Sequence, residues 1–574
     1  MNAFITSGNT AQEVGQNKKE EDKKRLQVII DYVDKVFETQ KDPYHGTPLF
    51  ADAINVRTGE LFKWKNEDDT TFTISNLSTQ QNFMRLLVGL SALTGNSKYK
   101  EAAVSATRYV FDHYMAEDHL LYWGGHTCVN LETQEVVGPD NKAMVHELKN
   151  CFPYYDLMFE VDRKKTSQFI EAFWNAHIYN WEDLEVGRHG QHLDKPKDYP
   201  FNHDFVEKEP HRTSIGLSFL NAGNDLMYAA AKYYQHNGDE KAYEWSEYLG
   251  KQYVDARDPV TKLGAYQFTQ KVQAIDPIVN HIPDSDTNSQ YGDRAKRQFA
   301  HRYPNALETR MLLGGRPLTI YATNSLMQLE LYLKLGEKAK NYKKWTIEGV
   351  LAFIKYMYNA EDYMVKPMMT DGTDLTGYTL EKDGYYGKKG TTLQRSKVTP
   401  NYLLAFARVY LVSKEDKAIS DSDRKAIWET VRSMAKGLGL GDIGEEDGTK
   451  INVNLNTTNS EGITLFAILD LYKITGSEVF LDLARVVGNN IVDTCYHYGY
   501  FTLGKDYVYG EVDMVEPLAV LALEAAIRGK SEVMPEFING KGYIEGNYKL
   551  PDGTVKNIGT SKIYAIKIAD YPAK

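Results

Sequence analysis

The chain runs FMRLLVGLSALTGN from residue 83 to residue 96, with apolar side chains at spacings of three and four residues. That spacing predicts one buried face of an amphipathic helix. Gly95 is placed to end this helix, because glycine adopts the left-handed conformation found at helix ends. Apolar residues resume near Tyr99, so the segment predicts two helices joined by a tight turn.

The same pattern returns at residues 233–254, 331–358 and 469–492, each time as an apolar helix, a glycine turn and an aromatic residue early in the next helix. Helical hairpins of this kind bury their apolar faces by stacking on one another. Open solenoids repeat about every 20–50 residues, whereas these turns lie roughly 100 to 140 residues apart. We therefore predict an all-α fold, and favour a closed α/α toroid of helical hairpins over an open solenoid.

Long polar segments separate the hairpins, and in a toroid they gather at one mouth, where binding and catalytic residues concentrate. In one of them, residues 121–123 are predicted to pair with residues 127–129 as a β-hairpin across Gly124-Gly125. The tail from Gly540 predicts short strands and turns. We expect residues 1–25 to form a polar arm and residues 26–574 to form a single toroid domain with this strand-containing tail.

The composition argues against several classes of protein. A formal net charge of −11 disfavours a broad basic surface for nucleic acid, and no stretch approaches the roughly 20 apolar residues of a membrane span. Three cysteines are too few for a disulfide framework. No apolar leader opens the chain, so we expect a cytoplasmic protein, or a secreted or periplasmic one if a leader has been removed. The 40 tyrosines suit a carbohydrate cleft, although packing of a large helical core explains them as well.

Four polar residues in the long segments are candidates for chemistry: His126, Glu147, Arg188 and His189. Two imidazoles and one carboxylate suit a divalent transition ion such as Mn²⁺, Co²⁺, Ni²⁺ or Zn²⁺. Sequence spacing alone favours ordinary surface or core histidines over a metal site, and both interpretations stay open at this point.

Other catalytic patterns are missing or less specific. The chain holds no GxSxG elbow, P-loop or dinucleotide-binding glycine pattern. His146 is followed four residues later by Asn150 rather than histidine, which excludes the zinc-protease helix. Acidic pairs such as Glu445-Glu446 suit a glycoside hydrolase, a class that helical toroids often host, so a hydrolase is the competing interpretation.

Eight stretches together carry a resemblance to a known family. They are Thr47–Phe50, Asn76–Phe83, Trp123–His126, Val145–Asn150, Phe152–Phe159, Phe173–His177, Arg188–Gly190 and Leu263–Phe268. No single stretch is specific, but in combination they make most of the chain similar to polysaccharide lyase family 2, the pectate lyases with an α/α-toroid fold.

The resemblance implies a metal site formed by His126, Glu147 and His189, with Arg188 beside it as the catalytic base. The implied ion is Mn²⁺, with Co²⁺ and Ni²⁺ as alternatives. The implied reaction is β-elimination of α-1,4-polygalacturonate or oligogalacturonides to 4,5-unsaturated products. The cation neutralises the C6 carboxylate of the sugar, which makes the neighbouring C5 proton removable.

Further residues are candidates for substrate binding around this centre. Trp123 is expected either to stack on a sugar face or to pack its hairpin. Asn150 and Tyr155 follow closely after Glu147 and are candidates to face the cleft, but core packing is the favoured role for Tyr155. Arginines bind carboxylates bidentately, and the candidates are Arg212, Arg297, Arg302 and Arg310. We expect a monomer. The alternatives to a lyase are a toroid-type glycoside hydrolase acting on acidic oligosaccharides and a non-catalytic oligogalacturonide-binding protein.

Overall fold

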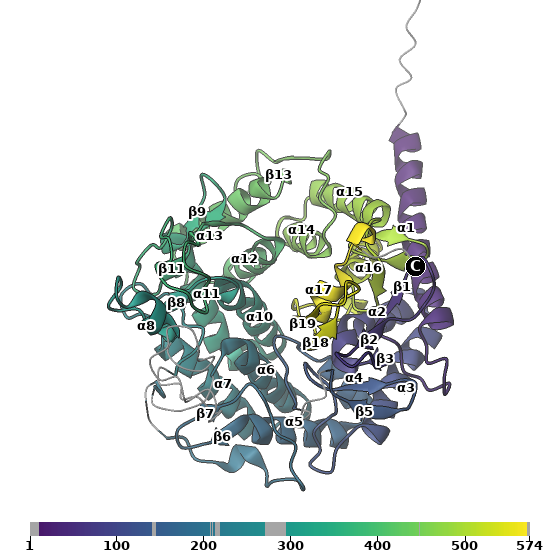
Figure 1. Cartoon of the computed structure of the whole chain (residues 1–574). Coiled ribbons are helices and arrows are strands. Elements are labelled where there is room, and N and C mark those ends of the chain that lie inside the picture. The colour runs from purple at the N-terminus through teal and green to yellow at the C-terminus, as the bar shows by residue number, and fades with distance from the viewer. Residues whose placement is uncertain are drawn as a thin grey trace, which may run out of the picture.

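The computed structural model describes residues 11–139, 145–206, 208, 210–212, 218–269, 294–446 and 448–570. Its long helices form an inner and an outer ring (Figure 1). The inner ring consists of α2 (Gln81–Thr94), α4 (Tyr155–Val161), α6 (Leu220–Asn237), α10 (Asn324–Leu335), α12 (Pro400–Ser413), α14 (Gly462–Thr475) and α16 (Val515–Ile527). The outer ring consists of α1 (Ala11–Thr39), α3 (Lys98–His113), α5 (Arg163–His177), α7 (Glu240–Asp255), α11 (Lys340–Tyr356), α13 (Asp421–Gly437) and α15 (Glu478–Cys495).

The ring closes because the first helix of the chain packs against the last long one, α1 on α16. Helix α2 also contacts α16, so the first and last inner helices are neighbours. Strand β1 (Ala53–Asn55) pairs antiparallel with β17 (Tyr509–Glu511), which joins the two ends of the chain a second time. These contacts confirm the prediction of a closed α/α toroid.

Glycine turns join inner helices to their outer partners, as the sequence pattern predicts. Gly95, Gly238 and Gly476 follow α2, α6 and α14 with φ values of 75°, 71° and 66° in the left-handed region. Gly336 has φ 58° but ψ −135°, and it opens a short 3₁₀ helix before α11. The turns lie at one end of the ring, so the long connections from outer to inner helices lie at the other.

Short strands and small helices fill these long connections. The helices are α8 (Arg294–Phe299), α9 (Arg316–Leu318) and α17 (Thr560–Tyr564). One sheet has the order β2 (Lys63–Lys65), β3 (Thr71–Ser75), β4 (Cys128–Asn130) and β5 (Glu135–Val137), and another the order β12 (Ser396–Lys397), β10 (Met364–Val365) and β9 (Tyr358–Asn359). The two-stranded pairs are β6 (Ile178–Asn180) with β7 (Glu185–Val186), β8 (Met311–Leu312) with β11 (Met368–Met369), β13 (Gly441–Asp442) with β14 (Asn452–Val453), β15 (Tyr496–His497) with β16 (Tyr500–Phe501), and β18 (Glu545–Lys549) with β19 (Val555–Gly559).

The β-hairpin predicted across Gly124-Gly125 is wrong in its pairing. Strand β4 pairs with β5 and β3, not with residues 121–123. The reason lies at Gly124, which has φ +100° and forms a parallel bridge with Glu147. The chain is turned toward residue 147 there, so it cannot fold back on itself.

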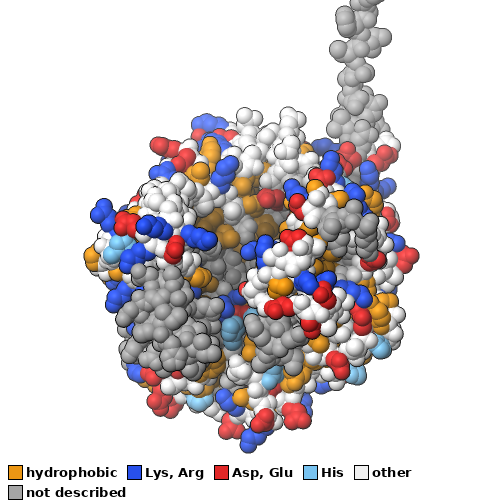
Figure 2. All heavy atoms as spheres, viewed as in Figure 1, with side chains coloured by type: hydrophobic (Ala, Val, Ile, Leu, Met, Phe, Trp, Pro, Cys, Tyr) orange, Lys and Arg blue, Asp and Glu red, His pale blue; other side chains and the backbone are white. Residues whose placement is uncertain are grey.

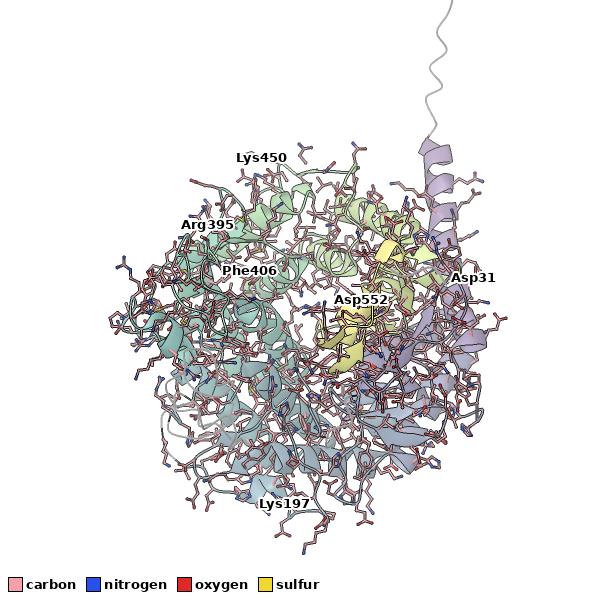
Figure 3. The ribbon with its side chains drawn as sticks, in the orientation of Figure 1. Asp31, Lys197, Arg395, Phe406, Lys450 and Asp552 are labelled. Atoms are coloured by element: carbon pink, nitrogen blue, oxygen red, sulfur yellow. The ribbon has the colours of Figure 1, made fainter. Side chains whose placement is uncertain are left out.

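The C-terminal tail lies inside the ring, whereas α1 projects beyond it (Figure 1). Asp552, labelled in Figure 3, lies in the turn between β18 and β19 and within the outline of the ring, while Lys197 and Lys450 lie at its rim. The predicted arm boundary at residue 25 falls inside α1, where Arg25 is buried against Glu524 of α16.

Two other features of the chain bear on its class. The cysteines at 128, 151 and 495 are buried and form no disulfide. Among the described residues, no helix combines the length and apolar character that a membrane crossing requires.

Candidate active site

Backbone pairing brings three distant segments together at the mouth of the ring. Gly124 bridges to Glu147, and His146 bridges to Gly190. The Gly125 amide donates to the carbonyl of Glu147 at 2.9 Å, and the His146 amide donates to the carbonyl of Gly190 at 2.9 Å. Ligand atoms of the side chains at 126, 147 and 189 consequently lie within 4.8 Å of one another.

Glu147 is at the centre of this group. His126 Nε2 lies 2.9 Å from Glu147 Oε2, and His189 Nε2 lies 3.5 Å from Oε1. Arg188 Nε and Lys149 Nζ approach the same Oε1 at 3.3 and 3.4 Å. The carboxylate is fully buried, so its charge is balanced by side chains rather than by water.

These neighbours decide the ionisation of Glu147. Burial alone would raise the pKa of this carboxyl, but the hydrogen bond with His126 and the charges of Lys149 and Arg188 outweigh burial and hold the pKa well below its usual range. Burial lowers the pKa of His189 to about 4. At neutral pH the site therefore holds a carboxylate beside a neutral imidazole, which are the forms that bind metal.

The donor atoms fit a divalent cation. Within the described residues, Glu147 Oε1 and His189 Nε2 are buried without a hydrogen-bond partner. His126 Nδ1 faces the carbonyl of Glu545 at 3.1 Å, and a carbonyl only accepts, so this nitrogen carries a proton. In the neutral ring Nε2 is then the nitrogen whose lone pair could bind a cation.

A chain of buried rings lies beneath the site. Trp123 Nε1 donates to His146 Nε2 at 2.9 Å, and His146 Nδ1 lies 3.0 Å from His177 Nε2. His177 Nδ1 lies 2.8 Å from the carbonyl of Gly187, the residue before Arg188. Trp123 is 1% exposed, so the expectation that it stacks on a sugar is corrected: it packs in the core and supports the site from below.

The two other candidates near Glu147 differ. Tyr155 is buried in the core beside Tyr228, with ring centroids 5.8 Å apart. Its burial agrees with the expected core packing and corrects the alternative of a substrate contact. Asn150 accepts a hydrogen bond from Asn224 at 2.9 Å and ties this turn to α6. A substrate role for Asn150 stays a prediction.

The predicted arginines are placed in different surroundings. Burial and the charge of Arg310 lower the pKa of Arg212, so these two guanidinium groups lie close together. Within the described part of the chain, no acidic partner neutralises either of them, which suits an anionic ligand. Arg302 is exposed, and Arg297 is half-buried on α8.

A second cationic cluster was not predicted from the sequence. Arg294 and Arg316 both donate to the buried carboxylate of Glu308, so the cluster keeps a net positive charge. Arg316 lies 5.1 Å from the ring centre of Tyr266, and the charge of Arg188 also reaches that tyrosine. Figure 2 shows basic and histidine side chains in the hollow at the centre of this face. Only the stretch Leu263–Phe268, already part of the resemblance, hinted at this side of the site.

Tyr543 is the other residue that the sequence did not indicate. Its hydroxyl donates to Glu147 Oε2, and its ring lies 4.2 Å from Lys149 Nζ. Tyr543 follows Glu147 by 396 residues, so no local pattern could connect the two.

Two sequence comparisons indicate the same family. Residues 47–547 match the family described as "Periplasmic pectate lyase". The chain is 32% identical to the pectate disaccharide-lyase of Dickeya dadantii (strain 3937) over 552 residues, covering 95% of this chain and 96% of that protein. The family description agrees with the periplasmic alternative for location and gives the cytoplasmic prediction no support.

Solved structures resemble this chain with much lower sequence identity. A GH76 α-mannanase of Bacteroides thetaiotaomicron is 9% identical with a TM-score of 0.40, over 89% of this chain and 96% of that one. The cellobiose 2-epimerase of Bacillus thermoamylovorans is 9% identical with a TM-score of 0.39, over 88% and 99%.

Proposed function

Since the chain belongs to the family of periplasmic pectate lyases and is a polysaccharide lyase, we propose that it cleaves α-1,4-polygalacturonate or oligogalacturonides by metal-assisted β-elimination. The observation that carries this proposal is the approach of two imidazoles and one guanidinium to the single buried carboxylate of Glu147. The products would be 4,5-unsaturated galacturonides.

His126 Nε2, His189 Nε2 and Glu147 would hold the cation, since their donor atoms lie within 4.8 Å of one another. Two nitrogens and one oxygen favour Mn²⁺, Co²⁺ or Ni²⁺ over Ca²⁺. When bound, the ion supplies a Lewis acid that neutralises the uronate carboxylate and makes the C5 proton more acidic.

Arg188 is the proposed base. It lies beside the ligands, so a sugar whose carboxylate faces them would present its C5 proton to the guanidinium. Arg188 Nε and Lys149 Nζ approach Glu147 Oε1 at 3.3 and 3.4 Å. The carboxylate favours the charged guanidinium, whereas the positive charges of Lys149 and of a bound cation would oppose it and increase the neutral fraction that accepts the proton. The C5–H electron pair then becomes the C4–C5 double bond, and the C4–O bond breaks with its electron pair leaving on the glycosidic oxygen, which takes a proton from water.

The cationic groups next to the site would hold the remaining carboxylates of the substrate. The guanidinium carbon of Arg294 lies 3.7 Å from the ring centre of Tyr385, which is 62% exposed. A substrate could therefore contact a planar cation and an aromatic face at the same place. Arg212 and Arg310 form a second pair. Arginine suits this role because its fork matches the geometry of a carboxylate.

Arg188→Lys tests the proposal, because lysine keeps the charge and loses the planar fork. We expect kcat on polygalacturonate, measured by the ultraviolet absorbance of the new double bond, to fall by about 10²–10⁴-fold, the usual contribution of a general base. The matched control is Arg163→Lys at the exposed start of α5, which should leave the rate unchanged.

A chelator should abolish the absorbance change, and added Mn²⁺ should restore it. Reducing ends released without absorbance would instead identify a hydrolase, and binding without turnover would identify a carbohydrate-binding protein. Undiminished elimination by Arg188→Lys would remove this residue from the role of base.

A further inference from the structure

The C-terminal segment 534–545 runs lengthwise through the ring. It runs antiparallel to α2. A Cβ at Gly89 would lie 3.0 Å from Met534. Nearer the start of α2, the Arg85 guanidinium donates to the carbonyl of Glu536 at 3.0 Å, and Asn82 donates to the carbonyl of Gly540 at 2.9 Å. The tail therefore enters from the end of the glycine turns and leaves at the mouth where the site lies.

Other inner helices hold the same segment. Phe537 stacks on Phe466 of α14 with ring centroids 4.2 Å apart, and Arg408 of α12 donates to the carbonyl of Phe537 at 2.9 Å. Tyr228 of α6 donates to Glu536 at 3.2 Å. Because opposite sides of the ring contact it, the segment has a defined position along the axis.

The tail delivers two groups to the candidate active site. The Tyr543 hydroxyl donates to Glu147 Oε2, and the carbonyl of Glu545 faces His126 Nδ1 at 3.1 Å. Gly125 leaves the space for this approach, since a Cβ there would lie 2.6 Å from the Tyr543 oxygen. Tyr543 contacts Oε2, the carboxylate oxygen that also faces His126, and leaves Oε1 to face His189.

We propose that Tyr543 is a positioning residue of the lyase reaction, holding the Glu147 carboxylate in the rotation that turns Oε1 toward His189. The carbonyl of Glu545 sets the tautomer of His126 in the same way. The C-terminal tail is then part of the active site rather than an appendage of the fold. This inference rests on the proposed function, because it assigns Tyr543 its effect through a cation site.

The physical argument is one of orientation. A carboxylate can rotate about its Cγ–Cδ bond, and a hydroxyl donating to one oxygen restricts that rotation. Partners behind metal ligands typically contribute 10- to 100-fold to metal affinity or activity. The tail is held along the axis by α2, α6, α12 and α14, so the hydroxyl arrives from a rigid support.

Tyr543→Phe removes only the hydroxyl, and Tyr564→Phe is the matched control. Tyr564 is also buried in the C-terminal tail, and its hydroxyl has no hydrogen-bond partner among the described residues. Titration with Co²⁺ alone, followed by its visible absorption spectrum, measures the site without turnover. We expect Tyr543→Phe to weaken Co²⁺ binding by about 10- to 100-fold and to alter the spectrum, while Tyr564→Phe matches the wild type in both.

Kinetics give a second measurement. At saturating Mn²⁺, kcat of Tyr543→Phe should fall while KM for oligogalacturonide stays within about twofold, because the cationic clusters that would bind substrate are untouched. Gly125→Ala, which displaces the same hydroxyl without removing it, should weaken Co²⁺ binding in the same direction.

The outcomes separate the two proposals. If wild type binds Co²⁺ and eliminates substrate but Tyr543→Phe is indistinguishable from it, the inference is overturned and the lyase function stands. If wild type gives no Co²⁺ spectrum, the metal-assisted function is overturned and the inference falls with it.

Discussion

His177 and His146 are buried histidines whose hydrogen bonds define where each proton sits. The Trp123 indole can only donate, so His146 Nε2 accepts and His146 Nδ1 donates to His177 Nε2. His177 Nδ1 then donates to the carbonyl of Gly187. Neutral rings satisfy the whole chain, and a proton added to either ring would break one of its bonds.

This arrangement predicts a loss of stability in acid. Burial lowers the pKa of His177 to about 4, below the ordinary value of about 6.5. The stabilisation is therefore complete above pH 6.5 and is lost as the pH falls toward 4, by about 3 kcal/mol in full. Urea unfolding at pH 7.5, 6, 5 and 4 measures this, and His177→Gln should show a shallower fall. Equal pH dependence in both proteins would contradict the assignment.

At the scale of elements, the site depends on how closely two backbone segments approach. Gly124 has φ +100°, and a Cβ there would lie 2.5 Å from the carbonyl oxygen of Glu147. That oxygen belongs to the backbone and has no flexible side chain to move aside. The short parallel bridge at this point therefore requires glycine, for its space as much as for its conformation.

Gly124→Ala should consequently damage the site and not only the fold. The matched variant is Gly553→Ala, which has φ +86° but open space around the new Cβ. Both changes place a non-glycine residue in the left-handed region, which lowers the free energy of unfolding by about 1–2 kcal/mol. We expect Gly553→Ala to retain Mn²⁺-dependent elimination and Gly124→Ala to lose at least about 10-fold of it as Glu147 shifts. Elimination by Gly124→Ala at the control's rate would show that the close approach is dispensable.

At the scale of the whole molecule, closure of the ring depends on α1. Arg25 is 2% exposed and donates to Glu524 of α16 at 2.8 Å and to Asn489 of α15 at 2.6 Å. Arg528 donates to the other oxygen of Glu524, so removal of Arg25 would leave this buried carboxylate one cationic partner.

Arg25→Ala should lower the free energy of unfolding by about 1–3 kcal/mol, because Glu524 and Asn489 lose a buried hydrogen-bond donor while Arg528 still balances the carboxylate charge. Lys24→Ala, at an exposed position one residue earlier in the same helix, should change it by less than about 0.5 kcal/mol. Urea denaturation measures both. Equal stability of the two variants would mean that the α1–α16 contact does not support the ring.

Much of the helical architecture was predictable, and the site was predictable in part. The hairpins at Gly95, Gly238 and Gly476 follow the apolar spacing, because helix periodicity and glycine turns act over a few residues. The pairing of residues 121–123 was predicted wrongly, because the bridge from Gly124 to residue 147 competes with the local hairpin. The periodicity of apolar residues contains no information about a bridge between distant segments.

Local sequence was enough to define the helices, the turns and the residue types suited to holding a cation, since each depends on neighbours along the chain. Three-dimensional packing alone placed Trp123 and Tyr155 in the core, brought α1 onto α16, and led Tyr543 through the ring to Glu147. Those outcomes depend on contacts between residues as many as 499 positions apart, and such contacts form only when the whole ring excludes water from its interior.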